Sequence, residues 1–177
     1  DYITQPEDAR IDLSGDDAKV IDEVDGNAPI RDEILQEITQ AVDHQEAALT
    51  LSDSCYEEPA VHASDSTIRD TMDQITGYTS STVHYQIDGV DENLDSKTIL
   101  HMLNISGDGT VTLNEEKLTQ FVQHLASTYN TYGDVRDFKT SSGDTVKIGG
   151  GDYGWVINKT KEAARLKEDL SGGTPVE

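Results

Sequence analysis

Residues 138–155 read FKTSSGDTVKIGGGDYGW and determine how the last third of the chain folds. The stretch has no continuous apolar run, and its glycines stand beside Tyr153 and Trp155. Glycine reaches backbone conformations that other residues avoid, so the chain can bend sharply and expose main-chain N–H groups here. The pattern predicts a hairpin over residues 138–148, closed around 141–144, and then a shaped loop. The two rings either fill a small core or present flat faces to a ligand.

Helices are predicted on both sides of this stretch. Asn158 is a good N-cap for a helix that runs to Leu170 and ends at Gly172. The longest helix is expected from residue 114 or 115 to Tyr129, with acidic residues in its first turn. One face of that helix is apolar and carries Leu118, Phe121, Val122, Leu125 and Tyr129.

The N-terminal third predicts a strand, a helix and a second strand. Residues 18–24 alternate as a strand does, and Asp25-Gly26 supplies a turn before Pro29 opens a helix. The helix has one apolar stripe formed by Ile30, Ile34, Leu35, Ile38, Ala41 and Val42. Residues 47–51, AALTL, are predicted to form the next strand.

The middle of the chain predicts a linker and a second set of elements. Residues 53–64 show no periodicity and contain Pro59, which indicates a connection between two lobes. A helix is expected over residues 66–76 with Gly77 as its C-terminal cap, then a strand within residues 81–88 and a short helix over 95–103.

A faint repeat relates the two ends of the chain. The strand, glycine turn and helix of VIDEVDGNAPIRDEILQEI recur in VKIGGGDYGWVINKTKEAARL, with Gly26 matching Gly154 and the helix start displaced by about one residue. We therefore expect an α+β fold with two small lobes, residues 1–62 and 63–177, in which helices pack on short two- or three-stranded sheets. A divergent duplication would account for the two lobes.

Composition excludes several classes of function. The chain has 177 residues, of which 35 are acidic and 13 basic, for a net charge of −22. Charge attraction to nucleic acid or to an anionic membrane surface is therefore not expected. Residues 130–177 are closer to balance, with eight acids and seven bases, so an anionic partner would approach that part. Cys55 is the only cysteine, which rules out an intramolecular disulfide.

Residues 129–173, from YNTYGDVRDF to LKEDLSGG, resemble the region that precedes the catalytic domain in L,D-transpeptidases of Gram-positive bacteria, the peptidoglycan-binding domain. The resemblance rests on YNTYG at 129–133, on Arg136, Phe138, Thr140 and Gly143, and on GGDYGW and Ile157-Asn158. The family usually has Asp where this chain has Asn158, and asparagine keeps the capping role. EVDGN at 23–27 and CYEEP at 55–59 extend the similarity to nearly the whole chain.

This resemblance implies a non-catalytic module that binds peptidoglycan, through its glycan or its stem peptide, or positions an enzyme in the wall. The partner in the same polypeptide would be a C-terminal transpeptidase domain, on the cell-wall side of a protein anchored to the membrane by a segment outside this chain. The family's catalytic Ser-His-Gly-Cys motif is absent from these residues, and Cys55 lies among acids that oppose thiolate formation. No cofactor is expected.

Four aromatic residues and one arginine are the ligand-binding candidates, namely Tyr129, Tyr132, Tyr153, Trp155 and Arg136. Arg136, with Lys139 and Lys147, could meet the carboxylates of stem peptides. Tyr132 and Tyr153 are expected to be exposed, whereas Trp155 is expected to lie in a core. An alternative role is a rigid spacer that holds the transpeptidase domain away from the membrane without binding a ligand.

A second alternative is a calcium loop at residues 104–115, NISGDGTVTLNE. Its spacing fits the twelve-residue calcium template, with Asp108 and Glu115 as the charged ligands. Asparagine at the first position removes a strong oxygen ligand, so a turn followed by a short strand and a helix start is the favoured interpretation. A glycosidase site has no support beyond the abundance of carboxylates.

Overall fold

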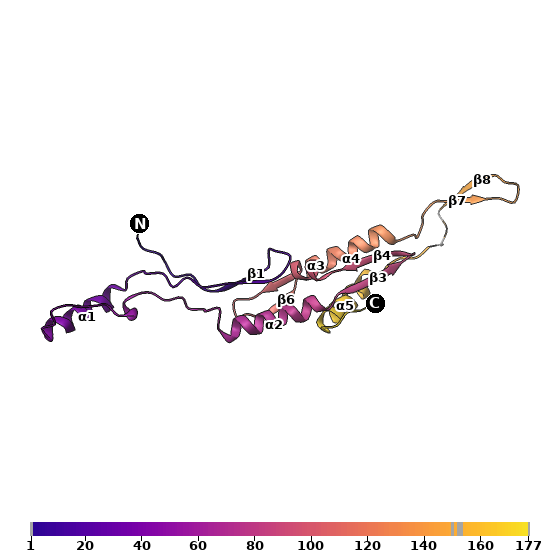
Figure 1. Cartoon of the computed structure of the whole chain (residues 1–177). Helices are drawn as coiled ribbons and strands as arrows, with labels where there is room; N and C mark the ends of the chain where they lie inside the picture. Colours follow the sequence, from indigo (N-terminus) through magenta and orange to yellow (C-terminus); the bar gives the residue numbers. More distant parts are fainter. Residues whose placement is uncertain (1, 150, 152–153, 177) are drawn as a thin grey trace. The chain divides into compact units, whose positions relative to one another are not determined.

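The computed structural model describes residues 2–149, 151 and 154–176, and it has a mixed α+β architecture (Figure 1). Among those residues the strands form two-stranded antiparallel sheets, each built from neighbouring strands of the sequence. The predicted α+β class with short sheets is therefore confirmed. The chain divides into two compact units, Asp1–Asp73 and Gln74–Glu177. The border predicted at residues 62 and 63 stays a prediction.

The first unit begins with a short hairpin and a helix. β1 (Arg10–Asp12) pairs with β2 (Lys19–Ile21), and α1 (Arg31–Asp43) follows. A 3₁₀ turn, η1 (Asp53–Cys55), comes next, and α2 (Ser66–Ser80) starts in this unit. The strand and the helix predicted for this part are confirmed in position.

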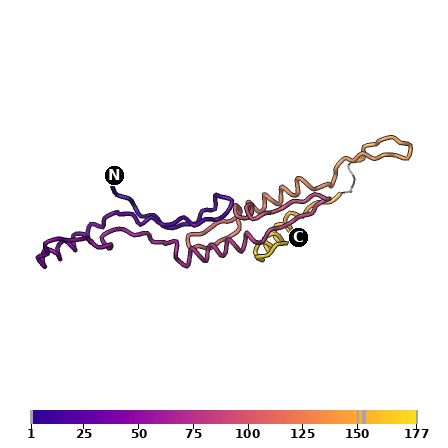
Figure 2. Tube along the Cα trace, viewed as in Figure 1, coloured from indigo at the N-terminus to yellow at the C-terminus, as the bar shows by residue number. Residues whose placement is uncertain are grey.

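The rest of this unit is held by pairing between extended segments rather than by a large core. The amide of Glu57 donates to the carbonyl of Ala28 at 2.8 Å, and the amide of Ala9 donates to Val61 at 2.9 Å. These bonds join the segment that precedes α1 to the segment that follows η1, and Figure 2 shows the two segments running side by side. Residues 53–64, predicted as a connection, thus bond to the N-terminal segment.

The strand predicted at residues 47–51 is wrong, because the structure has no strand there. A strand needs a neighbour that completes its hydrogen bonds. The described residues of the first unit supply none to AALTL, and Leu49 is exposed.

The second unit has more regular structure. Hairpin β3 (Val83–Ile87) with β4 (Val90–Leu94) is followed by α3 (Ser96–His101) and by hairpin β5 (Leu103–Ile105) with β6 (Val111–Leu113). Then come α4 (Glu115–Tyr129), hairpin β7 (Arg136–Lys139) with β8 (Thr145–Ile148), and α5 (Lys159–Ser171). The predictions for α3, α4, the last hairpin and α5, with Asn158 as its N-cap, are confirmed.

A single cluster forms the core of this unit, where α4 and α5 pack together with the β3–β4 hairpin (Figure 1). Leu166 and Leu170 of α5 are completely buried in it, and Ala163 packs at its edge. The cluster is completed by Val83, Leu94, Ile99, Met102, Leu118 and Val122. Burial of this apolar area is what stabilises the unit.

Two features of this unit differ from the sequence-based expectation. Gly77 does not end α2, which continues to Ser80, because Tyr78 of the next turn packs against the core and extends the buried face. Strand β4 was not predicted, although Asp88 and Gly89 mark its turn. Both have positive φ, 52° and 78°, as a tight two-residue hairpin turn requires.

The repeat is visible in the backbone of the two units. α1 begins five residues after Gly26 (26 to 31), and α5 begins five residues after Gly154 (154 to 159). Both glycines have positive φ, both helices have 13 residues, and Arg10 pairs with Ile21 as Arg136 pairs with Ile148. The expected displacement of the helix start is wrong, since the glycine-to-helix spacing is the same in both copies.

Candidate functional site

The glycine-rich stretch folds back against the end of α4. The amides of Thr131 and Tyr132 donate to the carbonyl of Trp155 at 3.1 and 3.3 Å, and the Trp155 amide donates to Thr131 Oγ1 at 3.2 Å. Residues 154–155 and residues 131–132 meet in what we call the crossing. Gly154 lies there with φ +126°, and a Cβ on it would stand 2.6 Å from Tyr132 Cα. Only glycine fits both this conformation and this space. The crossing therefore fixes Tyr132 next to Trp155.

Tyr132 and Trp155, which we call the crossing pair, both reach solvent. The exposed fraction is 57% for Tyr132, as predicted, and 39% for Trp155. The expectation that Trp155 lies in the core is wrong, because the core of this unit is filled by aliphatic side chains of α4, α5 and the β3–β4 hairpin. A backbone-anchored pair of exposed rings is suited to stacking on an apolar ligand face.

The β7–β8 hairpin lies between Tyr132 and Trp155 in the sequence, and both of its strands are exposed along their whole length. Phe138 faces Val146, and Arg136 faces Ile148. Because alternate residues of a strand share a face, these four side chains lie on one face of the hairpin, which we call the hairpin face. Lys139 and Lys147 lie on the opposite face. The hairpin thus offers apolar and cationic groups in an otherwise acidic protein.

The remaining aromatic candidates differ in position. Tyr129 is the last residue of α4 and is half-buried, and its hydroxyl donates to Glu92 Oε2 at 2.6 Å. The hydrogen bond to Glu92 raises the pKa of Tyr129. Tyr129 thus links α4 to β4, and its hydroxyl is already used in this bond and not available to a ligand. Tyr153 lies outside the described residues. Arg136 begins β7 and is exposed.

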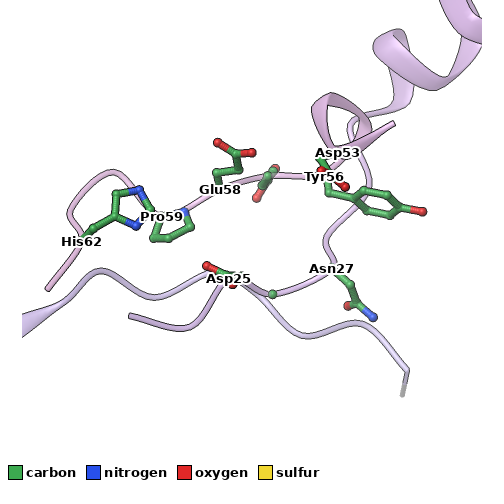
Figure 3. A pocket seen from close by; sticks show the side chains of 9 residues that line it. Asp25, Asn27, Asp53, Tyr56, Glu58, Pro59 and His62 are labelled. Carbon is green, nitrogen blue, oxygen red and sulfur yellow. The ribbon is translucent and has the colours of Figure 1, made fainter. Parts of the chain in front are cut away.

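An acidic cleft of about 530 Å³ lies within the first unit (Figure 3). It opens between residues 25–27 and 53–62. Beside the cleft, the amide of Glu57 donates to the carbonyl of Ala28 and joins these two segments. Four of the lining side chains are carboxylates, those of Asp25, Asp53, Glu57 and Glu58. The others belong to Asn27, Tyr56, Pro59 and His62. This cleft was not predicted, because its residues come from two segments that are far apart in the sequence and meet only after folding.

His62 at the edge of this cleft is paired with Glu23. Its Nδ1 lies 3.1 Å from Glu23 Oε1, and the amide of Ala63 donates to Glu23 Oε2 at 2.8 Å. The hydrogen bond to Glu23 raises the pKa of His62. The hydrogen bond from the amide of Ala63 is the main cause that lowers the pKa of Glu23, and the hydrogen bond with His62 also lowers it. The pair fastens residues 61–63 to the segment that follows β2.

The two weak metal candidates have separate partners. Asp108 accepts a hydrogen bond from the amide of Thr110 at 3.0 Å inside the β5–β6 turn, and Glu115 forms an ion pair with Lys167 of α5 at 2.6 Å. Residues 104–115 thus form a tight turn, a strand and a helix start. No cluster of three or more His, Cys, Asp or Glu side chains suited to a metal occurs in the described part of the chain.

Cys55 is completely buried in η1. Burial raises the pKa of its thiol, and the carboxylate of Glu37 raises it further. A high pKa disfavours the nucleophilic thiolate. The direction agrees with the prediction that the surrounding acids oppose thiolate formation.

Comparison with known proteins gives a family and two solved structures. The family model described as "Putative peptidoglycan binding domain" matches residues 67–177, which is more than half of the chain. A cysteine-to-serine mutant of Enterococcus faecium L,D-transpeptidase matches with a TM-score of 0.50 and 25% identity over 61% of this chain. The carbamoyl enzyme that Ldtfm forms with avibactam matches with a TM-score of 0.49 and 25% identity over 62%. No curated protein matches the chain.

The match covers 44% of each of those solved chains, so this chain spans less than half of their length. None of the described helices is long and apolar enough to cross a bilayer. The family match includes α4, the β7–β8 hairpin, the crossing pair and α5, on which the resemblance in the sequence also rests. Through its residues 67–177, the chain belongs to the family of peptidoglycan-binding domains.

Proposed function

We propose that this chain is the peptidoglycan-binding, wall-positioning module of an L,D-transpeptidase of a Gram-positive bacterium. A domain of this family binds and does not catalyse. The reaction, cross-linking of stem peptides, would belong to a transpeptidase domain in the same polypeptide, and the module would lie outside the cell, in the wall. The solved structure that matches with a TM-score of 0.50 is an L,D-transpeptidase, which supports this proposal.

The observation that carries the binding role is the crossing pair. Tyr132 and Trp155 are exposed, and hydrogen bonds hold their backbones next to each other, so a ligand that contacts both rings need not order the backbone that carries them. Their rings suit the apolar faces of sugar units. Arg136 on the neighbouring hairpin face suits the carboxylates of the stem peptide, because guanidinium binds carboxylate in a bidentate manner.

The test is co-sedimentation of the chain with purified, insoluble peptidoglycan. We expect the wild-type chain to sediment in a saturable manner, and the double variant Tyr132→Ala with Trp155→Ala to lose roughly tenfold or more in affinity, as an interface hot spot does. Tyr2→Ala is the matched control, because it removes a tyrosine that is 98% exposed in the other unit. A wild-type chain that does not sediment would refute binding and favour the spacer.

The transpeptidase part has its own test. The complete polypeptide that carries this module should contain a Ser-His-Gly-Cys motif and should cross-link stem peptides. Substitution of that cysteine should abolish the cross-linking and leave the sedimentation of the polypeptide unchanged. Loss of sedimentation on this substitution would place the ligand contacts outside the module.

A further inference from the structure

Hairpins β1–β2 and β7–β8 are each preceded by the same short motif. Asp8-Ala9-Arg10 leads into β1, and Asp134-Val135-Arg136 leads into β7. In each case the arginine is the first residue of the strand and pairs with an isoleucine of the next strand. The motif Asp-x-Arg, which we call the entry motif, therefore has one structural position in both units.

In the first unit, the entry motif binds the backbone of an extended segment. The carboxylate of Asp8 accepts from the amides of Ala60 and Val61, both through Oδ1, at 2.6 and 3.1 Å. The amide of Ala9 donates to the carbonyl of Val61 at 2.9 Å. All three bonds go to main-chain groups, so the motif recognises the backbone of a peptide and needs no particular side chain.

A second position, two residues after the glycine Gly26, also holds that segment. It is Ala28, whose carbonyl accepts from the amide of Glu57 at 2.8 Å. Both alanines that bond to the segment are buried, since Ala9 is 5% and Ala28 is 4% exposed. The first unit thus shows how a peptide occupies this place.

The corresponding positions of the second unit are open. Asp134 is exposed, and its carboxylate has no hydrogen-bond or ion-pair partner among the described residues. Val135 corresponds to Ala9, and Val156 lies two residues after its glycine as Ala28 does. The two valines are 65% and 57% exposed. A carboxylate that can accept from amides and two apolar side chains are therefore available to a peptide.

We infer that Asp134, Val135 and Val156 form a site for an extended peptide, and that this peptide is the stem peptide of peptidoglycan. The Asp134 carboxylate would accept from two successive amides of the peptide, and the Val135 amide would donate to the carbonyl of the second. The Val156 carbonyl would accept from an amide earlier in the peptide. The site would act through main-chain hydrogen bonds, as the entry motif of the first unit does.

The choice of the stem peptide rests on the proposed function. The crossing pair lies within two residues of Asp134 and directly before Val156 in the sequence, so the peptide attached to a bound sugar would start close to this site. Charge agrees with this ligand, which carries carboxylates. Residues 130–177 hold eight acids and seven bases, whereas residues 1–60 hold seventeen acids and three bases, so repulsion of an anionic peptide is weakest here.

The test separates the peptide from the sugar. The isotope-labelled chain is titrated with a synthetic stem tetrapeptide without sugar, and separately with glycan fragments without peptide, while its amide signals are followed by NMR. We expect millimolar tetrapeptide to move the Val135 amide proton downfield in a saturable manner, because this amide gains a hydrogen-bond acceptor. Asp134→Ala should weaken tetrapeptide binding roughly tenfold or more and leave the glycan titration unchanged.

Two further variants control for charge and for the acceptor oxygen. Asp137→Ala removes a carboxylate from an exposed position of β7 and should bind the tetrapeptide as the wild-type chain does. Asp134→Asn keeps an acceptor oxygen and should retain more affinity than Asp134→Ala, since Asp8 uses a single oxygen for both of its bonds. The amide spectrum of each variant shows that it is folded. Equal losses in Asp137→Ala and Asp134→Ala would overturn the inference.

Failure of this inference is distinguishable from failure of the proposed function. A chain that sediments with the wall through the crossing pair, but whose Val135 amide does not respond to the tetrapeptide, would overturn the peptide site alone. A synthetic peptide of residues 56–63, the segment that the first unit binds, is the second probe. If that peptide moves the Val135 signal and the tetrapeptide does not, the site takes a protein segment and its assignment to the stem peptide is wrong.

Discussion

Ile38 and Leu166 occupy equivalent positions of two repeated helices, yet Ile38 is 43% exposed and Leu166 is completely buried. The difference lies in the surroundings and not in the helices, which have the same length and the same spacing from a positive-φ glycine. The first unit thus presents an apolar helix face to solvent.

Alanine substitutions at these two positions should have unequal effects. Leu166→Ala leaves a cavity in a packed cluster, for which a loss of about 2–5 kcal/mol in the free energy of unfolding is typical. Ile38→Ala in the present chain should change it by about 0.5 kcal/mol or less, as most exposed substitutions do. Urea unfolding followed by circular dichroism measures both. Equal losses would show that α1 is already covered.

Glycine 154 should tolerate substitution far less well than Gly143. Both have positive φ, but a Cβ at Gly154 meets the backbone of Thr131 and Tyr132, whereas nothing lies within 4 Å of one at Gly143. Gly143→Ala should cost roughly 1–2 kcal/mol from the strained backbone alone. Gly154→Ala should cost several kcal/mol or displace the crossing pair, because backbone must move. Thermal unfolding compares the two variants, and similar melting temperatures would contradict the described crossing.

The pair of His62 and Glu23 predicts how stability of the first unit depends on pH. The pKa of His62 is raised from its ordinary value of 6.5, so its contribution is complete below that pH and is lost as the pH rises through the raised value. The pKa of Glu23 is lowered from 4.5, so its contribution is complete above that pH and is lost as the pH falls.

Both contributions are therefore complete between about pH 4.5 and 6.5. The melting temperature of the wild-type chain should fall as the pH rises above this window, and His62→Gln should flatten that fall. His44→Gln, which replaces an exposed histidine next to α1, is the matched control. An unchanged pH profile in His62→Gln would show that the pair does not contribute.

Calcium should not bind to residues 104–115. The Glu115 carboxylate already pairs with Lys167, and the Asp108 carboxylate accepts from the Thr110 amide, so calcium would have to compete with a lysine for the one glutamate of the loop. Titration of the chelator-treated chain with millimolar calcium should release no heat. A saturable heat that disappears in Glu115→Gln would contradict the assignment of this segment as a turn, strand and helix start.

The sequence was sufficient for elements whose signals are local. The α4 stripe, the Asn158 cap and the hairpin at 138–148 are each specified by neighbouring residues, and the structure places all three as predicted. Elements that depend on a distant partner were less predictable. AALTL has the composition of a strand but no strand beside it in the described residues, and the acidic cleft is formed by segments far apart in the sequence.

The candidate site was predicted in part. Family residues around 129–158 pointed to the region, and Tyr132 is exposed there as expected. The exposure of Trp155 was not predicted, because the core is filled by aliphatic residues of five elements, β3, β4, α3, α4 and α5, which come together only in the fold. The exposure of the hairpin face was not predicted either. Its strands alternate as a half-buried hairpin would, although the described hairpin is exposed throughout.

Binding of the chain to the wall should not weaken when the salt concentration is raised to the physiological value. The chain carries a net charge of −22, so any anionic groups on the wall repel it, and salt screens this repulsion. Binding through the crossing pair should therefore hold or strengthen between low and physiological ionic strength. Co-sedimentation at the two salt concentrations measures this. A steep loss of binding with salt would instead indicate that contacts from Arg136, Lys139 and Lys147 dominate.

Trp155 is the only tryptophan of the chain, so its fluorescence reports directly on the proposed contact surface. The most direct measurement is a titration of the chain with soluble peptidoglycan fragments that contain both sugar and stem peptide, followed by tryptophan emission and acrylamide quenching. Binding at the crossing pair predicts a saturable change in emission and protection from acrylamide, with a midpoint that Tyr132→Ala shifts to higher fragment concentration. Fragments that leave emission and quenching unchanged at concentrations where the chain binds insoluble wall would contradict the assignment of the crossing pair as the binding surface.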